Sequence, residues 1–400
     1  MPNRRIQYAT IFLTVFVDIL GFGIVIPVLP LYAEQFGASP VGIGWLVGIF
    51  SLMQFFFAPV WGRLSDRVGR KPVLLIGMLG TVAGYLIMGF AGSFLMLFLA
   101  RLFSGVAGAN ISAAQAYLAD ISSPENRAKA MGLLGAAFGL GFVFGPALGG
   151  WASGTFHYST PMFIAAGLAA INVVFMLVFL PESRTPGLSQ SLPRGVSGLF
   201  QHVRRGQFLW SVAAYFSVIA GFSIMTTIFA LYLLHRFELG VQHTGFILAG
   251  IGVLGVLIQG GLIGRLARRF GEPALAVTGA VIMACGLAGL ALAGGILPML
   301  AAAAAVGVGN SLIMPSLSSL ASRAADADWQ GRALGVLQSA GSLARFLGPF
   351  TCGLLLAMEA GSSGQIPYGA LPLATAAGIL IVSVGIAWCL RRAYRTESTA

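Results

Sequence analysis

Long apolar stretches follow one another along most of the chain, with short polar segments between them. Each stretch is close to the roughly 20 residues that a helix needs to cross the hydrocarbon core of a bilayer. The long alternating segments typical of membrane β-barrels are absent. The pattern therefore predicts an all-α membrane protein with twelve transmembrane helices. The expected spans lie near residues 6–32, 41–61, 73–92, 94–119, 129–154, 160–180, 208–234, 243–264, 274–294, 296–321, 333–357 and 370–390.

Composition and charge agree with this class. Of the 400 residues 57% are hydrophobic and only 9% are charged. All but three of the 23 lysines and arginines lie on the side of the expected membrane that both termini share, the exceptions being Arg236 on the opposite side and Arg101 and Arg345 within spans. The positive-inside rule then predicts a multi-pass protein of the cell (inner) membrane with both termini in the cytoplasm. We attribute the net charge of +11 to the anionic inner leaflet of the lipid bilayer, so no nucleic-acid partner is expected.

Several classes of site have no counterpart in the sequence. The three cysteines fall in apolar spans, and the four histidines lack the spacing of metal ligands. Neither a phosphate-binding glycine loop nor a nucleophile elbow is present. We therefore expect no metal, no cofactor and no enzyme activity.

An internal repeat divides the chain. GRLSDRVG at 62–69 matches GRLARRFG at 264–271 at an offset of 202 residues, and a second match, at an offset of 203, relates 130–150 to 333–353. The longest polar connection, 182–207, separates six spans from six. We expect an N-terminal six-helix bundle over 1–181, a cytoplasmic linker over 182–207 and a C-terminal six-helix bundle over 208–400. Similar halves that rock about a site between them are typical of transporters.

The stretch GRLSDRVGRK at 62–71 resembles the loop signature of the major facilitator superfamily, G-x-L-[AS]-D-[RK]-x-G-[RK]-[RK]. The resemblance implies the fold of two pseudo-symmetric six-helix bundles and a charge cluster that holds the cytoplasmic face closed. In this role Asp66 is expected against a helix of the other half, and the arginines against Asp120 or Glu125. We name these residues the cytoplasmic gate motif: Gly62, Asp66, Arg67, Gly69, Arg70 and Lys71.

A second resemblance lies in the fifth expected span. GFVFGPALGG at 141–150 is similar to the antiporter signature of drug-exporting members, G-x-x-x-G-P-x-x-G-G. Glycines give one face of this helix a smooth surface for close packing, and a proline permits a bend. The resemblance favours an exporter over an importer. The antiporter motif comprises Gly141, Gly145, Pro146, Gly149 and Gly150.

Further stretches point to one branch of the family. LFLARLFSGVAGA at 97–109 resembles a third family pattern built around an intramembrane arginine, here Arg101. VDILGFGIVIPVLPLY at 17–32 and SLARFLGP at 342–349 look most like the tetracycline-efflux branch of the twelve-span drug:proton antiporters. Those pumps carry further acids in spans 3 and 9, and this chain has none in either span. The resemblance therefore implies drug efflux without implying tetracycline as the substrate.

Asp18 is the only one of the twelve acids that lies well inside an expected span. A charge near the bilayer centre costs roughly 2.5–3.5 kcal/mol on insertion scales, so this carboxyl group needs a cavity, a partner or a proton. Burial favours its protonated form and a nearby arginine its ionised form, a balance that suits proton coupling. The alternative is a permanently hydrogen-bonded aspartate that holds the first span in place. Arg101 either stabilises the ionised Asp18 or belongs to a structural network.

The remaining polar groups of the spans are candidates for the substrate cavity. The 29 phenylalanines and 13 methionines suit a mostly apolar cavity, and one acid suits amphipathic or cationic compounds. For Arg345, three interpretations stay open: a contact with an anionic group of the cargo, a contact with a lipid, or a side chain that snorkels to the cytoplasmic face. The cavity candidates are Gln54, Asn110, Gln115, Gln259, Asn310, Gln338 and Arg345.

The sequence thus predicts a proton-coupled antiporter that exports small amphipathic compounds and works as a monomer. Three alternatives remain. A lipid or glycolipid flippase of the same fold would place a head-group phosphate at Arg345. A proton-linked metabolite importer would reverse the direction of transport, and a membrane enzyme or receptor would need a catalytic pair or an output domain.

Overall fold

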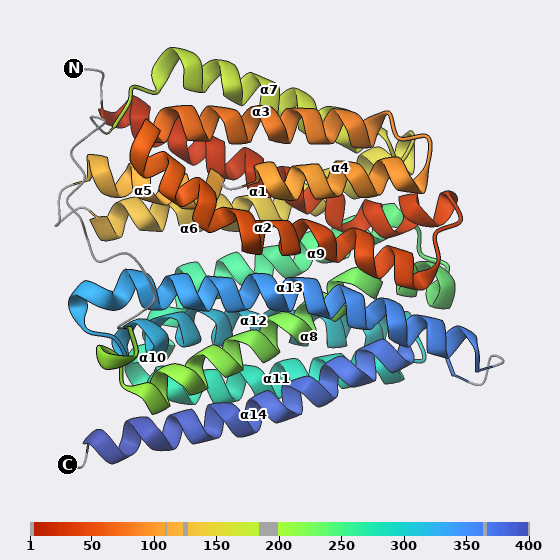
Figure 1. Ribbon diagram of the computed structural model, residues 1–400. Helices are drawn as coiled ribbons and strands as arrows, with labels where there is room; N and C mark the ends of the chain where they lie inside the picture. The colour runs from red at the N-terminus through yellow and green to blue at the C-terminus, as the bar shows by residue number, and fades with distance from the viewer. Residues whose placement is uncertain (1–3, 109, 123–126, 184–198, 363–365, 399–400) are drawn as a thin grey trace. The chain divides into compact units, whose positions relative to one another are not determined.

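The computed structural model describes the chain except for residues 1–3, 109, 123–126, 184–198, 363–365 and 399–400 (Figure 1). Two compact units form. Unit 1 comprises residues 1–190 and 239–249, and unit 2 comprises residues 191–238 and 250–400. The helix Val241–Leu257 is therefore shared between them. The three-part division expected from the sequence remains a prediction of domain organisation.

Unit 1 is a bundle of long apolar helices. Ser39 begins the second of them by accepting a hydrogen bond from the Gly42 amide at 3.1 Å, and Ser93 begins the fourth by accepting one from the Met96 amide at 3.3 Å. The helices are α1 (Arg4–Gln35), α2 (Pro40–Val68), α3 (Arg70–Gly89), α4 (Phe94–Ala107), α5 (Asn110–Ile121), α6 (Arg127–Thr155) and α7 (Thr160–Phe179).

Unit 2 repeats this design, and α9 (Val241–Leu257) belongs to both units. The π-helical turn η3 (Ile258–Leu262) continues α9 directly into α10 (Ile263–Phe270), so the three together form one membrane span. Apart from one isolated bridge between Val203 and Ala325, the described residues form only helices and loops. The other elements are η2 (Leu199–Gln201), α8 (Arg205–Phe237), α11 (Glu272–Leu292), α12 (Ile296–Arg323), η4 (Ala327–Trp329), α13 (Gln330–Ala360) and α14 (Ala370–Ser398).

Eleven described helices are long and apolar enough to cross a membrane. The fourth expected span, 94–119, is instead broken into α4 and α5 at Gly108, whose ψ of 48° is not helical. The Gln54 side chain donates a hydrogen bond of 2.9 Å to the Gly108 carbonyl oxygen at this break. Because a backbone carbonyl freed inside a bilayer is costly, this contact stabilises the broken span. The predicted all-α membrane fold is otherwise confirmed.

The same helix pairs recur in the two units. In unit 1, α1 packs on α6 and α7, and α3 packs on α4 and α7; in unit 2, α8 packs on α13 and α14, and α11 packs on α12 and α14. One hydrogen bond also recurs in both units. The Tyr32 hydroxyl donates to the carbonyl oxygen of Ala91 at 3.1 Å. Tyr232 lies 200 positions after Tyr32, and its hydroxyl donates to the carbonyl oxygen of Leu290 at 2.7 Å. The predicted internal duplication is thus present at the level of single contacts.

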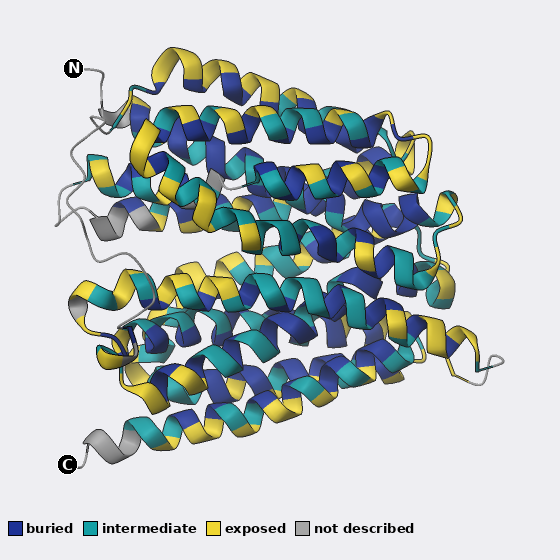
Figure 2. Cartoon of the chain, viewed as in Figure 1, coloured by how far each residue is buried: buried dark blue, intermediate teal, exposed yellow. Residues whose placement is uncertain are grey.

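Burial separates inner helices from outer ones. Residues of α8 are largely buried, whereas α7 exposes large apolar side chains, including Ile171, Val174 and Val178 (Figure 2). Exposed aliphatic side chains on a membrane-spanning helix are suited to contact with lipid. The outer face of α7 is therefore a lipid-facing surface of unit 1.

The end of the central connection is anchored on unit 2. The backbone of residues 202–204 exchanges hydrogen bonds with residues 324–326, the Arg204 amide to the Ala324 carbonyl oxygen at 2.8 Å and the Asp326 amide to the His202 carbonyl oxygen at 3.0 Å. The His202 ring stacks on Trp329 with their centroids 4.2 Å apart. The part of the expected linker that precedes α8 is therefore packed against the connection between α12 and α13.

Candidate functional site

The cytoplasmic gate motif joins α2 to α3 through a single residue. Gly69 has φ 107° and ψ 162°, a conformation that side chains with a Cβ rarely adopt. A Cβ at this position would also meet the carboxylate of Glu182. Glycine is thus required here both by the backbone turn and by the side chain packed against it.

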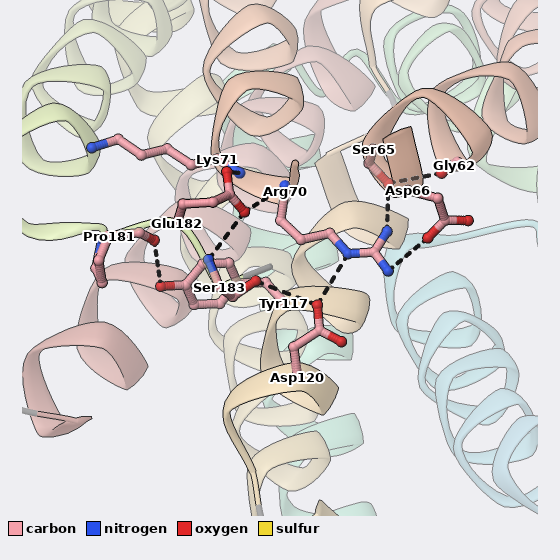
Figure 3. Close-up of polar contacts among 10 residues, drawn as sticks. All are labelled: Gly62, Ser65, Asp66, Arg70, Lys71, Tyr117, Asp120, Pro181, Glu182 and Ser183. Atoms are coloured by element: carbon pink, nitrogen blue, oxygen red, sulfur yellow. Dashed lines mark hydrogen bonds and ion pairs between the residues drawn. The ribbon is translucent and has the colours of Figure 1, made fainter. Parts of the chain in front are cut away.

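Arg70, the first residue of α3, is the centre of this motif (Figure 3). Its side chain is only 9% exposed. The guanidinium lies 2.8 Å from an Asp66 carboxylate oxygen, donates to Asp120 at 3.2 Å and donates to the Ser65 hydroxyl at 2.6 Å. Because α2, α3 and α5 each contribute to this cluster, Arg70 ties three helix ends together. Charge-assisted hydrogen bonds of this kind are among the stronger ones in proteins.

Two further expectations concern this cluster. Asp120 was one of two acids proposed as partners of the arginines, and it does contact Arg70. The other, Glu125, lies outside the described residues. Arg67 is exposed, and the ammonium of Lys71 donates to the carbonyl oxygen of Leu177 at 3.2 Å. The expected contact of Asp66 with a helix of the other half stays a prediction.

Glu182 was not identified from the sequence. Its carboxylate accepts hydrogen bonds from the backbone amides of Arg70 at 2.8 Å and Lys71 at 3.1 Å (Figure 3). These are the first two amides of α3, which have no partner inside the helix. Glu182 therefore caps α3 from more than a hundred residues away, where a negative charge also complements the positive end of the helix dipole.

Tyr117 positions this cap. Its hydroxyl donates to the carbonyl oxygen of Pro181 at 2.9 Å, which holds the chain just after α7 against α5. The Ser183 hydroxyl donates to Asp120 at 3.3 Å, so the cap and the Arg70 cluster share one acid. The only sequence signal for this arrangement was an acid directly after a span on the cytoplasmic side.

The diverged copy of the motif in unit 2 carries an ion pair of opposite polarity. Glu272 occupies the position 202 residues after Arg70 and likewise begins its helix, α11. Its carboxylate lies 3.0 Å from Arg323 and accepts a hydrogen bond of 2.6 Å from Ser319. Arg323 ends α12 and lies 203 residues after Asp120. The two units thus use equivalent positions for the same link with the charges exchanged.

The second group of predicted residues surrounds Tyr85. The hydroxyl of Tyr85 lies within electrostatic reach of both Asp18 and Arg101. Its ring packs directly over Gly21, one turn beyond Asp18 on α1, where a Cβ would collide with it. Tyr85 on α3 is therefore influenced by both residues proposed for proton coupling, and no sequence pattern singled it out.

The guanidinium of Arg101 packs over an aromatic ring. Its guanidinium carbon lies 4.3 Å from the centroid of the Phe50 ring, and the residue is 4% exposed. Its Nε atom is buried and has no hydrogen-bond partner. A buried donor without a partner is costly, so a hydrogen-bond acceptor that reaches this atom would be strongly favoured.

The antiporter motif lies along the contact between α6 and α1. A Cβ at Gly145 would lie 2.7 Å from the Leu20 carbonyl oxygen and 2.8 Å from the Gly23 Cα. A Cβ at Gly149 would lie 2.9 Å from the Ile24 Cα. The backbone of α1 can approach this closely because the α6 side of the crossing has no side chains at Gly145 and Gly149.

The other members of the motif serve neighbouring contacts. Gly141 faces Ile19, whose Cγ2 atom would lie 2.6 Å from an added Cβ. Gly150 faces Gly245 of α9, which belongs to the same unit, at 2.8 Å from an added Cβ to the Gly245 Cα. Pro146 packs its ring near Gly23. Each of these residues therefore has a packing contact inside unit 1.

The three polar residues proposed for the cavity in unit 1 lie on α2 and α5. Gln54 is used by the broken fourth span, and Gln115 is exposed on α5. Asn110 begins α5, and its side chain lies outside the described residues. Their assignment to a substrate cavity remains a prediction.

Unit 2 brings two of its four candidates together. Arg345 and Gln338 both lie beside the hydroxyl of Tyr215 on α8. Gln259 is exposed in the π-helical turn η3, and Asn310 is half-buried on α12.

No cluster of three or more histidine, cysteine or acidic side chains that could hold a metal ion occurs among the described residues.

These features define a multi-pass membrane transporter made of two similar helical units. The chain belongs to the Major Facilitator Superfamily, whose family model matches residues 11–349. Tetracycline resistance protein, class H, of Pasteurella multocida is 32% identical over 354 residues, which cover 85% of this chain and 86% of that protein. Multidrug resistance protein 1 of Bacillus subtilis is 27% identical over 391 residues, 97% of each chain. The family resemblance predicted from the sequence is confirmed.

The fold has solved counterparts as well. The crystal structure of a bacterial homolog to the human lysosomal transporter Spinster, in an inward-facing and unoccupied conformation, has a TM-score of 0.79 to this chain and covers 98% of both. At 15% identity this likeness concerns the fold alone. The relatives named for drug resistance do not favour a flippase or an importer.

Proposed function

We propose that this transporter exports small amphipathic compounds from the cytoplasm in exchange for protons. The observation that carries the proposal is that Asp18 and Arg101 both act electrostatically on Tyr85, which is buried in the interior of unit 1. Both Asp18 and Arg101 lie within membrane-spanning segments, where ionisable side chains are expensive and generally serve transport. The relatives named for tetracycline and multidrug resistance support drug-like cargo.

In this proposal Asp18 carries the proton. When the site is open to the outside, Asp18 takes up a proton and loses its negative charge. When the site is open to the cytoplasm, Asp18 releases the proton as cargo binds, and Arg101 stabilises the carboxylate. Tyr85 lies close to both groups and can donate to the ionised carboxylate or accept from the guanidinium.

The gate motif and the glycine contact have supporting roles. The Arg70 cluster and the Glu182 cap hold the cytoplasmic ends of α2, α3 and α5 as one body. The glycine face of α6 lets α1, which carries Asp18, pack without intervening side chains. Protons are the coupling ion, and we propose no metal or organic cofactor. We further propose that the transporter works as a monomer in the inner membrane with both termini in the cytoplasm.

The test is collapse of a pH gradient in inside-out vesicles. Lipophilic cations, tetracyclines and neutral antibiotics are added one at a time to vesicles that contain the wild type, Asp18→Asn or Asp328→Asn. Asp328 is an exposed acid within η4 and serves as a matched control. We expect at least one compound to release protons through the wild type and Asp328→Asn, and none to do so through Asp18→Asn. Equal release through Asp18→Asn would refute the role of Asp18.

A further inference from the structure

Unit 2 contains a polar cluster that the coupling mechanism does not use. On α13, Gln338, Ser342 and Arg345 recur at intervals of four and three residues and so share one face of the helix. The Arg345 guanidinium donates to the Ser342 hydroxyl at 3.2 Å. Tyr215 of α8 brings its hydroxyl beside both Gln338 and Arg345. Four side chains with hydrogen-bond donors therefore meet between α8 and α13.

A glycine makes room for this cluster. A Cβ at Gly341 would lie 2.9 Å from the Tyr215 ring and 3.4 Å from the Arg345 Nη1 atom. The tyrosine ring and the guanidinium thus both occupy the space above this residue. Tyr215 is 3% exposed, whereas Gln338 is exposed and Arg345 is half-buried. The polar groups of Gln338 and Arg345 are therefore accessible at the surface of unit 2.

Arg345 is the middle residue of α13 (Gln330–Ala360). At 1.5 Å per residue it lies about 22 Å from either end of the helix, too far for its side chain to reach a membrane surface. Within the described part of the chain no carboxylate forms an ion pair with Arg345; the described acids of unit 2 all lie in loops or near helix ends. A cation at this depth calls for a counter-charge that the described residues of unit 2 do not supply.

The duplication shows that the scaffold does not require these groups. Gly145 and Gly348 are 203 residues apart, and their added Cβ atoms would meet the carbonyl oxygens of Leu20 and Ala220, which are 200 residues apart. With these offsets each polar residue of the cluster can be matched to a position in unit 1. Apolar residues or glycine occupy the positions equivalent to Tyr215, Gln338, Ser342 and Arg345: Val15, Gly135, Gly139 and Phe142.

We propose that Arg345, Tyr215 and Gln338 bind an oxyanion group, a carboxylate, sulfonate or phosphate, of the exported amphipathic compound. This inference rests on the proposed function and specifies its substrate class. The guanidinium supplies a planar pair of donors that suits an oxyanion, and the hydroxyl and amide supply two more. An anionic cargo group would give Arg345 the counter-charge that it does not receive from the described residues of unit 2.

A matched pair of fluorescent probes tests this assignment. 8-Anilinonaphthalene-1-sulfonate and N-phenyl-1-naphthylamine share one aromatic skeleton, and only the first carries a sulfonate. Binding of each is measured to the full-length protein in phosphatidylcholine nanodiscs, with empty nanodiscs subtracted. The variants are Arg345→Gln, Tyr215→Phe and, as a matched control, Arg268→Gln, which changes an exposed arginine of α10.

We expect Arg345→Gln to weaken binding of the sulfonate at least about 10-fold, because a hydrogen bond to a charged group is worth about that factor or more. Tyr215→Phe should weaken it by a smaller factor. Binding of the neutral probe should change less than about twofold in every variant, which also shows that the variants are folded. Arg268→Gln should match the wild type with both probes.

Three results would overturn the assignment. One is sulfonate binding that Arg345→Gln leaves unchanged; another is an equal loss of both probes, which would indicate a structural role for Arg345. The third is displacement of the sulfonate when phosphatidylglycerol replaces part of the phosphatidylcholine, since the oxyanion would then belong to a lipid head group. In each case proton release by neutral or cationic compounds can persist, so failure here is distinguishable from failure of the proposed function.

Discussion

The contact between α1 and α6 allows a sharp test of how the antiporter motif acts. We consider Gly145→Ala and Gly149→Ala, each of which adds one methyl group at the crossing. The added carbon at Gly145 would lie 2.7 Å from the Leu20 carbonyl oxygen, and the one at Gly149 would lie 3.0 Å from the Ile24 carbonyl carbon. These neighbours are backbone atoms, so no side-chain rotation can make room.

The magnitude follows from this geometry. The two helices must move apart by several tenths of an ångström, which also loosens the contacts along the rest of the crossing. Overpacking a close contact by one methyl group typically costs about 1–3 kcal/mol. Gly135 lies on the same helix with no atom within 4 Å of an added Cβ, so Gly135→Ala adds the same group without a clash. Replacing a helical glycine by alanine is worth roughly 0.5–1 kcal/mol in the favourable direction.

The assay is thermal unfolding of the purified variants in one detergent, followed by intrinsic fluorescence. We expect Gly145→Ala and Gly149→Ala to unfold at lower temperature than the wild type, and Gly135→Ala to unfold at the same or a higher temperature. The reasoning fails if the three variants unfold together, because the close backbone approach would then contribute nothing specific to packing.

Two further predictions concern the helix ends at the gate motif and at its copy in unit 2. Glu182→Gln keeps the shape of the α3 cap but removes its charge, so we expect an apparent stability loss of about 0.5–1 kcal/mol that shrinks with added salt. A loss that is independent of salt would contradict an electrostatic cap. In unit 2, Glu272→Arg combined with Arg323→Glu restores the polarity found in unit 1, and thermal unfolding should show most of the single-variant loss recovered. Arg323 is 64% exposed, so the whole effect should stay within about 1 kcal/mol, and a double variant less stable than both singles would exclude simple pairing.

Hydropathy predicted the membrane spans well because a bilayer leaves so few alternatives for a chain of this composition. It did not predict the break of the fourth span at Gly108. That break depends on the side chain of Gln54, which reaches the freed carbonyl oxygen from a helix more than fifty residues earlier. A sliding window along the sequence contains no information about such a partner.

The residues of the candidate site likewise divide into those that the sequence reveals and those that it does not. Asp18, Arg101 and Arg70 stand out in the sequence because charges are scarce in or beside apolar spans. Tyr85 and Glu182 do not stand out, since a tyrosine is ordinary in a membrane helix and an acid is ordinary at its end. Their importance arises only from long-range packing, which places Tyr85 over Gly21 and Glu182 over Gly69.

The duplication explains how one scaffold could acquire two different chemistries. At the positions equivalent to Asp18 and Tyr85, unit 2 has Val218 and Leu287, and Arg101 corresponds to a position within the alanine run 301–305. The polar groups around Arg345 have apolar or glycine equivalents in unit 1. A buried ionisable group costs free energy wherever it is placed, so neither cluster is expected to persist for packing alone. The shared helix pairs therefore form the scaffold, and we infer that unit 1 was specialised for the proton and unit 2 for the charge of the cargo.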